Sequence, residues 1–326
     1  MPQAFDLAAA NLLTPAVLFF VLGLAAGFAR SDLSVPDQAA KTLSLYLMLA
    51  IGFKGGVEAS RAGPSDAFLS AAGAGLILSF GLPVIAFFIL KAVTRLDRTT
   101  AAATAAHYGS VSVVTFAAGT EYLRLIGVPF GGYMAAVVAL METPAILSAL
   151  LLAGAGRADR RQGATRELLR EVLLNGSVLL LVGAFFIGLV TGERGMSKLE
   201  VFVGPLFQGA LALFLLDMGL VAARRLLQSR KLTPALIAFG MIMPLISCAL
   251  SLTLALALGV RPADAAVLAI LASSASYIAV PAAMRLALPQ ADPGVYLTLS
   301  LGVTFPFNLV VGIPLYAWAA GRVFGS

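Results

Sequence analysis

The sequence has few of the side chains that catalysis and metal binding use. Its 326 residues include a single cysteine, Cys248, a single histidine, His107, and only 12% charged residues. One cysteine inside an apolar run excludes a disulfide framework and a thiolate metal site. An intramembrane enzyme pairing His107 with a serine is disfavoured, because no acid is matched to the histidine and no nucleophile elbow is present. The sequence therefore predicts neither an enzyme nor a resident cofactor or metal.

Long apolar runs take the place of the missing charge. The chain is 60% hydrophobic, whereas soluble domains carry roughly 25% charged residues. A helix needs about 20 mostly apolar residues to cross the hydrocarbon of a bilayer. We therefore expect an all-α polytopic membrane protein, with ten spans near residues 10–29, 36–60, 67–91, 100–118, 131–154, 171–191, 199–224, 233–258, 263–285 and 296–321.

The positive charges indicate how these spans are oriented. The net charge of +6 does not indicate nucleic-acid binding, because Lys and Arg lie between the apolar runs and not on one face. With the N-terminus outside, the inner loops hold fifteen Lys and Arg, against six in the outer loops and C-terminus. By the positive-inside rule, this bias predicts a multi-pass protein of the bacterial inner (plasma) membrane with both termini outside.

The two halves of the chain resemble each other at a separation of 162 to 167 residues. Residues 47–52 match 214–219, and Pro144 matches Pro306. Each half has five predicted spans, an odd number, so the second half must enter the membrane from the opposite side. We expect a 5+5 inverted repeat, typical of secondary transporters: a first repeat at 1–154, a cytoplasmic basic linker at 155–170 and a second repeat at 171–326.

Small and polar residues interrupt the fourth and ninth spans at equivalent positions, 107–112 and 272–277. One such stretch alone favours ordinary small-residue helix packing. Two equivalent stretches favour broken helices 4 and 9, with N-terminal amides that face each other near the midplane. Free amides and serine hydroxyls suit a small oxyanion.

Carboxylates also lie inside two predicted spans, at Glu142 and Asp217. An ionisable residue at that depth is costly and is functional by default. We expect sodium or a proton to neutralise these acids; a protonated or hydrogen-bonded Glu142 is the alternative. We predict the sodium ligands from their side-chain oxygens, which suit a hard cation, more than from any motif: Glu142, Thr143, Asp217, Thr304 and Asn308.

Other polar residues support more ordinary interpretations. Lys54 and Glu58 are four residues apart, which favours a helical ion pair with a structural or gate role over substrate contact. His107 is expected to be a packed histidine at the helix break, with a proton relay as the alternative. Tyr316 and Trp318 near the end of the last span are predicted to be interfacial anchors.

Four motifs resemble one family of transporters. Residues 43–56 (LSLYLMLAIGFKGG), 109–112 (GSVS), 141–144 (METP) and 274–283 (SASYIAVPAA) are similar to the cyanobacterial-type sodium-dependent bicarbonate transporters (SbtA-like). The resemblance implies the ten-helix inverted fold, sodium-coupled bicarbonate uptake, a homotrimer with elevator-like motion, and a PII-like regulatory protein on the cytoplasmic face. The short basic linker makes that partner less expected here. Carried over by motif, the residues lining the bicarbonate site would be Gly109, Ser110, Val111, Ser112, Ser274, Ala275, Ser276 and Tyr277.

The leading hypothesis is a sodium-dependent bicarbonate symporter, with the sodium ion a co-transported ligand. A symporter of another small anion, such as a short carboxylate, on the same scaffold is the nearest alternative. A passive channel is a further one, and uphill accumulation of the anion would exclude it.

Overall fold

The computed structural model describes residues 13–62, 65–154, 176–228 and 231–325, and this part of the chain forms helices and no strand. The predicted linker 155–170 lies outside the described residues. The first half contains α2 (Pro15–Phe28), α3 (Asp37–Ala62), α4 (Asp66–Val93), α5 (Arg98–Gly109), α6 (Val113–Leu125) and α7 (Met134–Ala153). The second half contains α9 (Gly176–Val203), α10 (Pro205–Gln228), α11 (Pro234–Ala257), α12 (Pro262–Ala272), α13 (Ala279–Ala287), α14 (Pro293–Thr298), η1 (Leu299–Thr304), α15 (Phe305–Phe307), η2 (Asn308–Gly312) and α16 (Ile313–Phe324).

Six helical stretches of the described chain are long and apolar enough to cross a membrane. They are Asp66–Val93, Met134–Ala153, Leu179–Val203, Pro205–Gln228, Pro234–Ala257 and Pro293–Phe324. The chain is therefore an all-helical polytopic membrane protein, which confirms the predicted class. The remaining predicted spans correspond to the 14-residue α2, to α3 with its charged residues, and to two interrupted helices. The count of ten stays a prediction.

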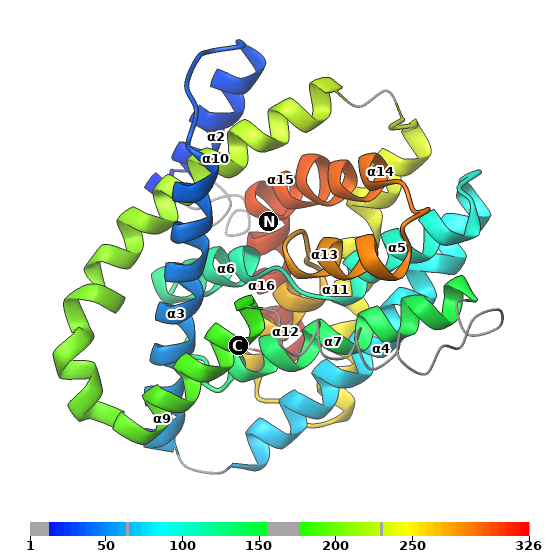
Figure 1. The fold of residues 1–326 in the computed structure, drawn as a ribbon. Helices are drawn as coiled ribbons and strands as arrows, with labels where there is room; N and C mark the ends of the chain where they lie inside the picture. Colours follow the sequence, from blue (N-terminus) through cyan, green and yellow to red (C-terminus); the bar gives the residue numbers. More distant parts are fainter. Residues whose placement is uncertain (1–12, 63–64, 155–175, 229–230, 326) are drawn as a thin grey trace.

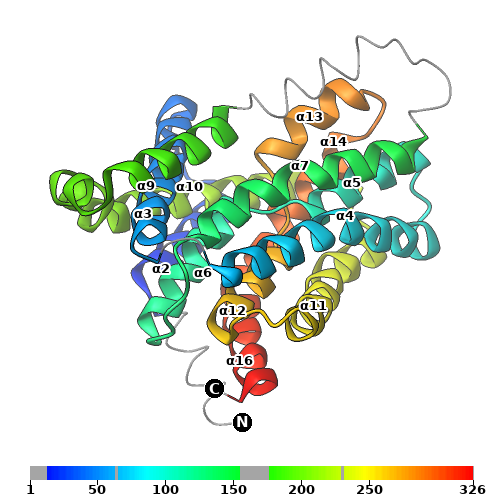
Figure 2. The same cartoon turned by 90° about the horizontal axis from the view of Figure 1, so that it is seen from below.

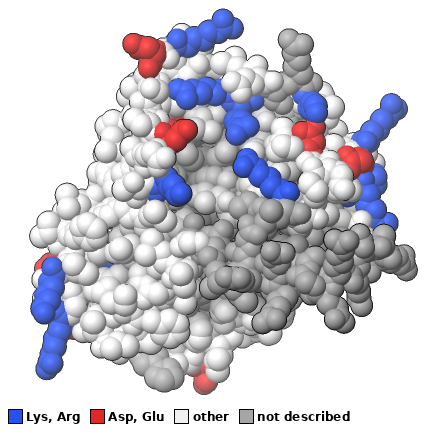
Figure 3. Space-filling model, viewed as in Figure 1, with Lys and Arg blue, Asp and Glu red and all other residues white. Residues whose placement is uncertain are grey.

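The charged and apolar side chains on the surface are also distributed as in a membrane protein. Figure 3 shows Lys and Arg mainly over the upper part of this face and along its right edge. Between these regions and a smaller group at the lower left, the described surface is largely uncharged. Large apolar side chains such as Val190, 84% exposed, and Leu151, 77% exposed, face outward. An exposed apolar belt of this kind is what a lipid environment requires.

The helices form two groups that lie side by side in Figures 1 and 2. The four-helix group consists of α2, α3, α9 and α10, in which α2 packs along α10 and α3 packs along α9. The main group consists of the other helices, with α4, α5 and α7 packed together and α12 packed between α11 and α16. Both interruptions predicted from the sequence belong to the main group.

Glycines allow the close helix pairs of the four-helix group. A β-carbon on Gly23 of α2 would lie 2.0 Å from the Leu216 carbonyl oxygen of α10, and one on Gly219 would lie 2.2 Å from the Phe20 carbonyl oxygen. On the other pair, a β-carbon on Gly188 of α9 would lie 2.2 Å from the carbonyl oxygen of Phe53 in α3. Small residues at such crossings let backbones approach within the membrane.

The boundary between α9 and α10 differs from the prediction of spans at 171–191 and 199–224. The stretch α9 is interrupted at Gly192, where the backbone is non-helical with φ 52°, which agrees with the predicted end at residue 191; glycine adopts this conformation without steric cost. The helix that follows begins at Pro205, because proline needs no N–H partner at a helix start. The predicted start at residue 199 was therefore too early.

The last helical stretch contains two wide turns. The π-helical segments η1 and η2 lie on either side of Pro306. Proline has no N–H to donate to the carbonyl one turn earlier, and π turns of this kind are common at functional sites. The stretch is otherwise continuous from Pro293 to Phe324, close to the predicted span at 296–321.

Candidate substrate and cation site

Two unwound segments cross inside the main group. One is residues 110–112, between α5 and α6, and the other is residues 273–278, between α12 and α13. The amide of Ser112 donates to Ser274 Oγ at 2.9 Å, and the amide of Ser276 donates to the His107 carbonyl at 2.8 Å. Segments 162 residues apart thus supply each other with the hydrogen bonds that broken helices lose.

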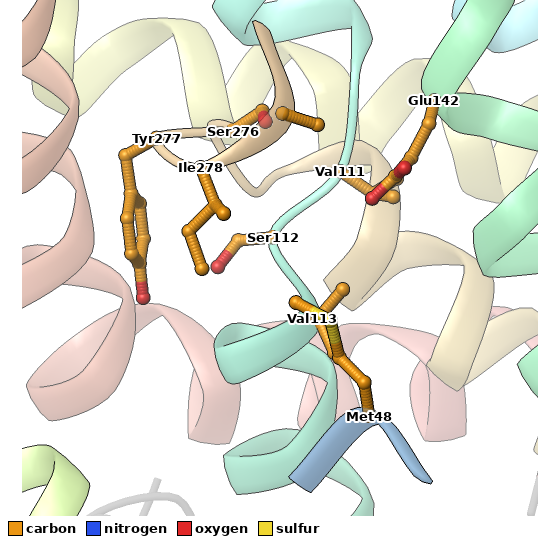
Figure 4. Close-up of a pocket in the computed structure, with 9 residues that line it drawn as sticks. Met48, Val111, Ser112, Val113, Glu142, Ser276, Tyr277 and Ile278 are labelled. Atoms are coloured by element: carbon orange, nitrogen blue, oxygen red, sulfur yellow. The ribbon is translucent and has the colours of Figure 1, made fainter. Parts of the chain in front are cut away.

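The crossing encloses a small cavity. Its lining includes residues from both unwound segments, together with Met48 of α3 and Glu142 of α7 (Figure 4). The cavity volume is about 10 Å³, close to the space that one water molecule needs. A three-oxygen anion does not fit in this conformation, so binding requires the walls to separate. Met48 is the one lining residue contributed by the four-helix group.

Two helix N-termini line this cavity. Ser112 and Val113 begin α6, and Ile278 and Ala279 begin α13. The Ser112 side chain accepts a hydrogen bond from the Thr115 amide at 3.2 Å, whereas α13 has no side-chain cap. The first amides of a helix lack intrahelical partners and carry the positive end of the helix dipole. Their convergence makes the cavity attractive to an anion.

Glu142 faces the same cavity. Its side chain is 3% exposed and projects from α7 toward Val111 (Figure 4). One of its carboxylate oxygens has no hydrogen-bond partner among the described residues, and the same holds for the hydroxyl of Ser110. Buried polar atoms without partners cost free energy, so these are the groups with most to gain from a ligand.

The predicted anion-site residues all lie at the crossing, in different roles. Val111, Ser112, Ser276 and Tyr277 line the cavity, and Ser274 joins the two segments. Ser110 and Ala275 are buried beside it. Gly109 ends α5 at a close contact with α4, since a β-carbon there would lie 2.1 Å from Pro83 Cγ.

The predicted cation ligands do not converge. Glu142 is on the cavity, but Thr143, the next residue, faces an apolar cleft of about 950 Å³ between the two helix groups. Asp217 lies in α10 of the four-helix group, with Arg224 and Asp37 as its charged neighbours. No cluster of three or more His, Cys, Asp or Glu able to hold a metal occurs in the described chain.

Thr304 and Asn308 form a second polar layer behind the crossing. Asn308 Nδ2 donates to the carbonyl of Ser273 at 2.7 Å, and Asn308 Oδ1 accepts from Tyr316 at 2.7 Å. Thr304 Oγ1 donates to the Gly240 carbonyl at 2.8 Å and lies 2.6 Å from the Tyr108 hydroxyl. Asn308 therefore fixes the backbone of the second break, whereas Thr304 joins its helix to α11 and α5, and neither side chain lines the cavity.

Two of the tyrosines in this layer were missed or misread in the sequence. Tyr316 is fully buried, so its prediction as an interfacial anchor is wrong; Trp318 is 36% exposed. Tyr108 follows His107 directly in the first interruption, yet its role depends on Thr304, 196 residues away. Only the spacing of Tyr316, eight residues after Asn308 and on the same helical face, could have suggested its role.

The remaining predictions have clear outcomes. Lys54 and Glu58 form no ion pair in the described chain, so that prediction is wrong. The Lys54 ammonium lies instead 4.5 Å from the centre of the Phe207 ring of α10. His107 is fully buried, with Nδ1 2.7 Å from the Ala103 carbonyl and its ring 4.6 Å from that of Tyr296, as expected for a packed histidine.

A comparison with known families agrees with this geometry. A sequence profile described as the Na+-dependent bicarbonate transporter superfamily matches residues 15–321. The chain belongs to this superfamily. No individually curated protein matches the sequence significantly. Membership of the Na+-dependent bicarbonate transporter superfamily makes the chain a transporter and not an enzyme, and the match covers both helix breaks and Glu142. The resemblance inferred from the four sequence motifs is thereby confirmed.

Proposed function

We propose that the protein couples sodium entry to bicarbonate uptake, with both ions in the cavity at the helix crossing. The observation that carries this proposal is that two helix N-termini and the carboxylate of Glu142 line one cavity. Helix-end amides attract an anion, whereas a buried carboxylate repels it. A sodium ion between them removes the repulsion, so each ligand supplies part of the field that holds the other.

Within this proposal, the predicted residues have unequal roles. The two unwound segments hold bicarbonate through amides and serine hydroxyls, and Glu142 is the principal sodium ligand. Thr304 and Asn308 act indirectly, because Asn308 holds the second break and Thr304 holds α11 and Tyr108 beside it. Thr143 and Asp217 do not line the cavity, so only their oxygen atoms, which suit sodium, support their prediction as ligands.

The proposed architecture is a ten-span, 5+5 inverted repeat divided as 1–154, 155–170 and 171–326. The glycine contacts support it. Gly23 and Gly188 are 165 residues apart and each packs on a carbonyl of its partner helix, in the pairs α2–α10 and α9–α3. Gly219 and Gly52 are 167 residues apart and complete the same two contacts from the other side. Equivalent helices thus make equivalent crossings.

The proposed motion is an elevator-like displacement of the main group against the four-helix group. Two features support it: the polar cavity belongs almost wholly to the main group, and Met48 of the four-helix group covers it. Moving one group past the other would uncover the cavity without rebuilding the crossing. The location in a bacterial inner membrane with both termini outside rests on the charge bias of the loops. A homotrimer and a PII-like cytoplasmic partner are further predictions of the resemblance.

Reconstituted vesicles test the function. Labelled bicarbonate should accumulate inside against its own gradient when sodium is higher outside, and accumulation should stop when sodium is equal on both sides. Uptake that is indifferent to the sodium gradient would remove the symport proposal. Formate and acetate in excess test the alternative substrate class: bicarbonate transport predicts weak inhibition, whereas equal competition would assign a broader small-anion symporter.

A further inference from the structure

A second cavity lies on the line along which α3 packs against α6 and α7. Helix α3 lines the candidate site with Met48 and the second cavity with Lys54 and Glu58. Helix α6 lines the first with Val113 and the second with Arg124. At 1.5 Å per residue, Met48 and Lys54 are separated by about 9 Å of helix. The two cavities therefore follow one another along the contact between α3 and α6, at the boundary of the helix groups.

The second cavity is lined by two cations and one carboxylate. The charged groups that act on Lys54 are Arg124, Glu121 and Glu58. Arg124 lies 3.7 Å from Glu121, a neighbour on α6 that is not part of the cavity lining. Lys54 has no ion pair in the described chain. The three lining groups carry one net positive charge, Glu121 offsets that of Arg124, and Lys54 is the lining cation without an ion-pair partner in the described chain.

Aromatic rings hold these cations in place without neutralising them. Lys54 Nζ lies 4.5 Å from the centre of the Phe207 ring, and the Arg124 guanidinium lies 5.1 Å from that of Phe130. Contact with an aromatic face stabilises a cation only weakly where water has access. Lys54 therefore keeps the capacity to bind an anion, and Arg124 adds a positive charge that Glu121, 3.7 Å away, offsets in part.

Apolar side chains separate the two cavities. Ile51, one turn after Met48, and Phe116, one turn after Val113, are 6% and 4% exposed and line the inner side of the second cavity. An ion cannot cross such a contact without leaving its hydration. Helices α3 and α6 belong to different helix groups, so relative movement of the groups separates these two side chains.

We propose that Lys54 and Arg124 form an entry site that recruits the transported anion, and that Ile51 and Phe116 form the apolar barrier between this site and the helix crossing. The ligand class is a small monovalent oxyanion, and the identity of that ion rests on the proposed function. The entry cavity has a volume of about 20 Å³ in this structure, so it is closed here and admits the anion only as the groups separate. Thr120, whose hydroxyl donates to the Phe116 carbonyl at 2.8 Å, lines the wall between the barrier and Arg124.

Transport kinetics test the entry site. In reconstituted vesicles, Lys54→Gln should raise the KM for external bicarbonate about tenfold, the effect of losing about 1.4 kcal/mol of attraction, with little change in the maximal rate. Arg124→Gln should act in the same direction, and Lys54→Arg should restore the wild-type KM. Lys198→Gln, an exposed position on α9, removes the same charge elsewhere and should have no effect. Unchanged KM in both glutamine variants overturns the entry site.

A chemical readout separates the entry site from the identity of the substrate. Cys248 is the single cysteine, so Cys248→Ser provides a background for Thr120→Cys, a position that lines the cavity and leaves Lys54 and Arg124 in place. An anionic methanethiosulfonate should modify this thiol faster than a cationic one, because Lys54 and Arg124 both remain, and bicarbonate should slow the reaction. Lys198→Cys in the same background is the control and should show less charge preference. Equal rates for the two reagents at position 120, or no reaction at all, overturn the entry site even if vesicles show that bicarbonate is the wrong substrate.

Discussion

Glu142 is a buried carboxylate beside two helix N-termini, and its position explains why an anion carrier would depend on sodium. A carboxylate alone would repel the substrate across a cavity of this size. A sodium ion bound beside Glu142 would cancel this repulsion, so the anion would bind only when sodium is also bound. The sequence could indicate that Glu142 is functional, since an acid inside an apolar span is costly. It could not show that Glu142 shares a cavity with the serines of the helix breaks, because that depends on how α7 packs.

Replacing Glu142 with glutamine should weaken sodium activation. Glu142→Gln keeps the shape of the side chain but removes a charged ligand, so half-activation should need about tenfold more sodium. The measurement is initial bicarbonate uptake as a function of external sodium in vesicles. Glu200→Gln, on an exposed position of α9, is the matched control. An unchanged sodium dependence would take Glu142 out of the cation site.

Asp264 is a buried carboxylate with a structural role. Its carboxylate is fully buried and accepts hydrogen bonds from the Gly131 amide at 2.7 Å, the Tyr133 hydroxyl at 2.5 Å and Arg261 Nε at 2.6 Å. These bonds attach the start of α12 to the segment before α7. The sequence offers no signal for this contact, because Asp264 lies in the first turn of a helix, where an acid is common.

Asp264→Asn should therefore destabilise the fold, by about 3 kcal/mol, because the amide directs a donor at groups that are themselves donors. A thiol-reactive dye that reports the unfolding of buried Cys248 in detergent would measure this as a lower Tm. Asp66→Asn, at the exposed first turn of α4, should leave the Tm nearly unchanged. Equal melting of the two variants would refute the assigned role.

At the scale of helices, the breaks were readable from the sequence and their surroundings were not. Serine and glycine in otherwise apolar runs predicted interruptions at 107–112 and 272–277, and the structure has unwound segments within or overlapping these ranges, at 110–112 and 273–278. The bonds from Asn308 to the Ser273 carbonyl and from Thr304 to the Gly240 carbonyl could not be predicted. Both depend on which helices become neighbours, and helical periodicity carries no such information.

The helix crossings of the four-helix group yield a direct prediction. Gly219→Ala should disrupt the α2–α10 pair, because its β-carbon would lie 2.2 Å from the Phe20 carbonyl oxygen. Gly209→Ala, on the same helix with no atom within 4 Å of the added carbon, should be neutral or slightly stabilising through its helix propensity. Thermal unfolding in detergent compares them. A Gly219→Ala protein as stable as the Gly209→Ala protein would contradict the packing described here.

The whole molecule divides into two helix groups, and the polar cavity lies at their boundary. Met48 covers the cavity from the four-helix group, and Val113 lines it from the main group. If the groups move past each other during transport, fixing these two positions to each other should stop it.

Cysteines at Met48 and Val113 in a Cys248→Ser background test that motion. Oxidation should arrest uptake, and reduction should restore it, whereas each single-cysteine variant should be insensitive to oxidant. Full transport by the oxidised double variant, with the cross-link verified on a gel, would exclude relative movement of the groups at this boundary.

A reciprocal binding measurement tests most directly whether sodium and the anion share one cavity. Calorimetry on purified protein gives the Kd for bicarbonate with and without sodium, and the Kd for sodium with and without bicarbonate. Two ligands that stabilise each other must lower each other's Kd by the same factor, and that factor should be about tenfold or more for neighbouring opposite charges. In Glu142→Gln the factor should fall toward one. Independent binding of the two ions in the wild-type protein would contradict a shared cavity for sodium and the anion.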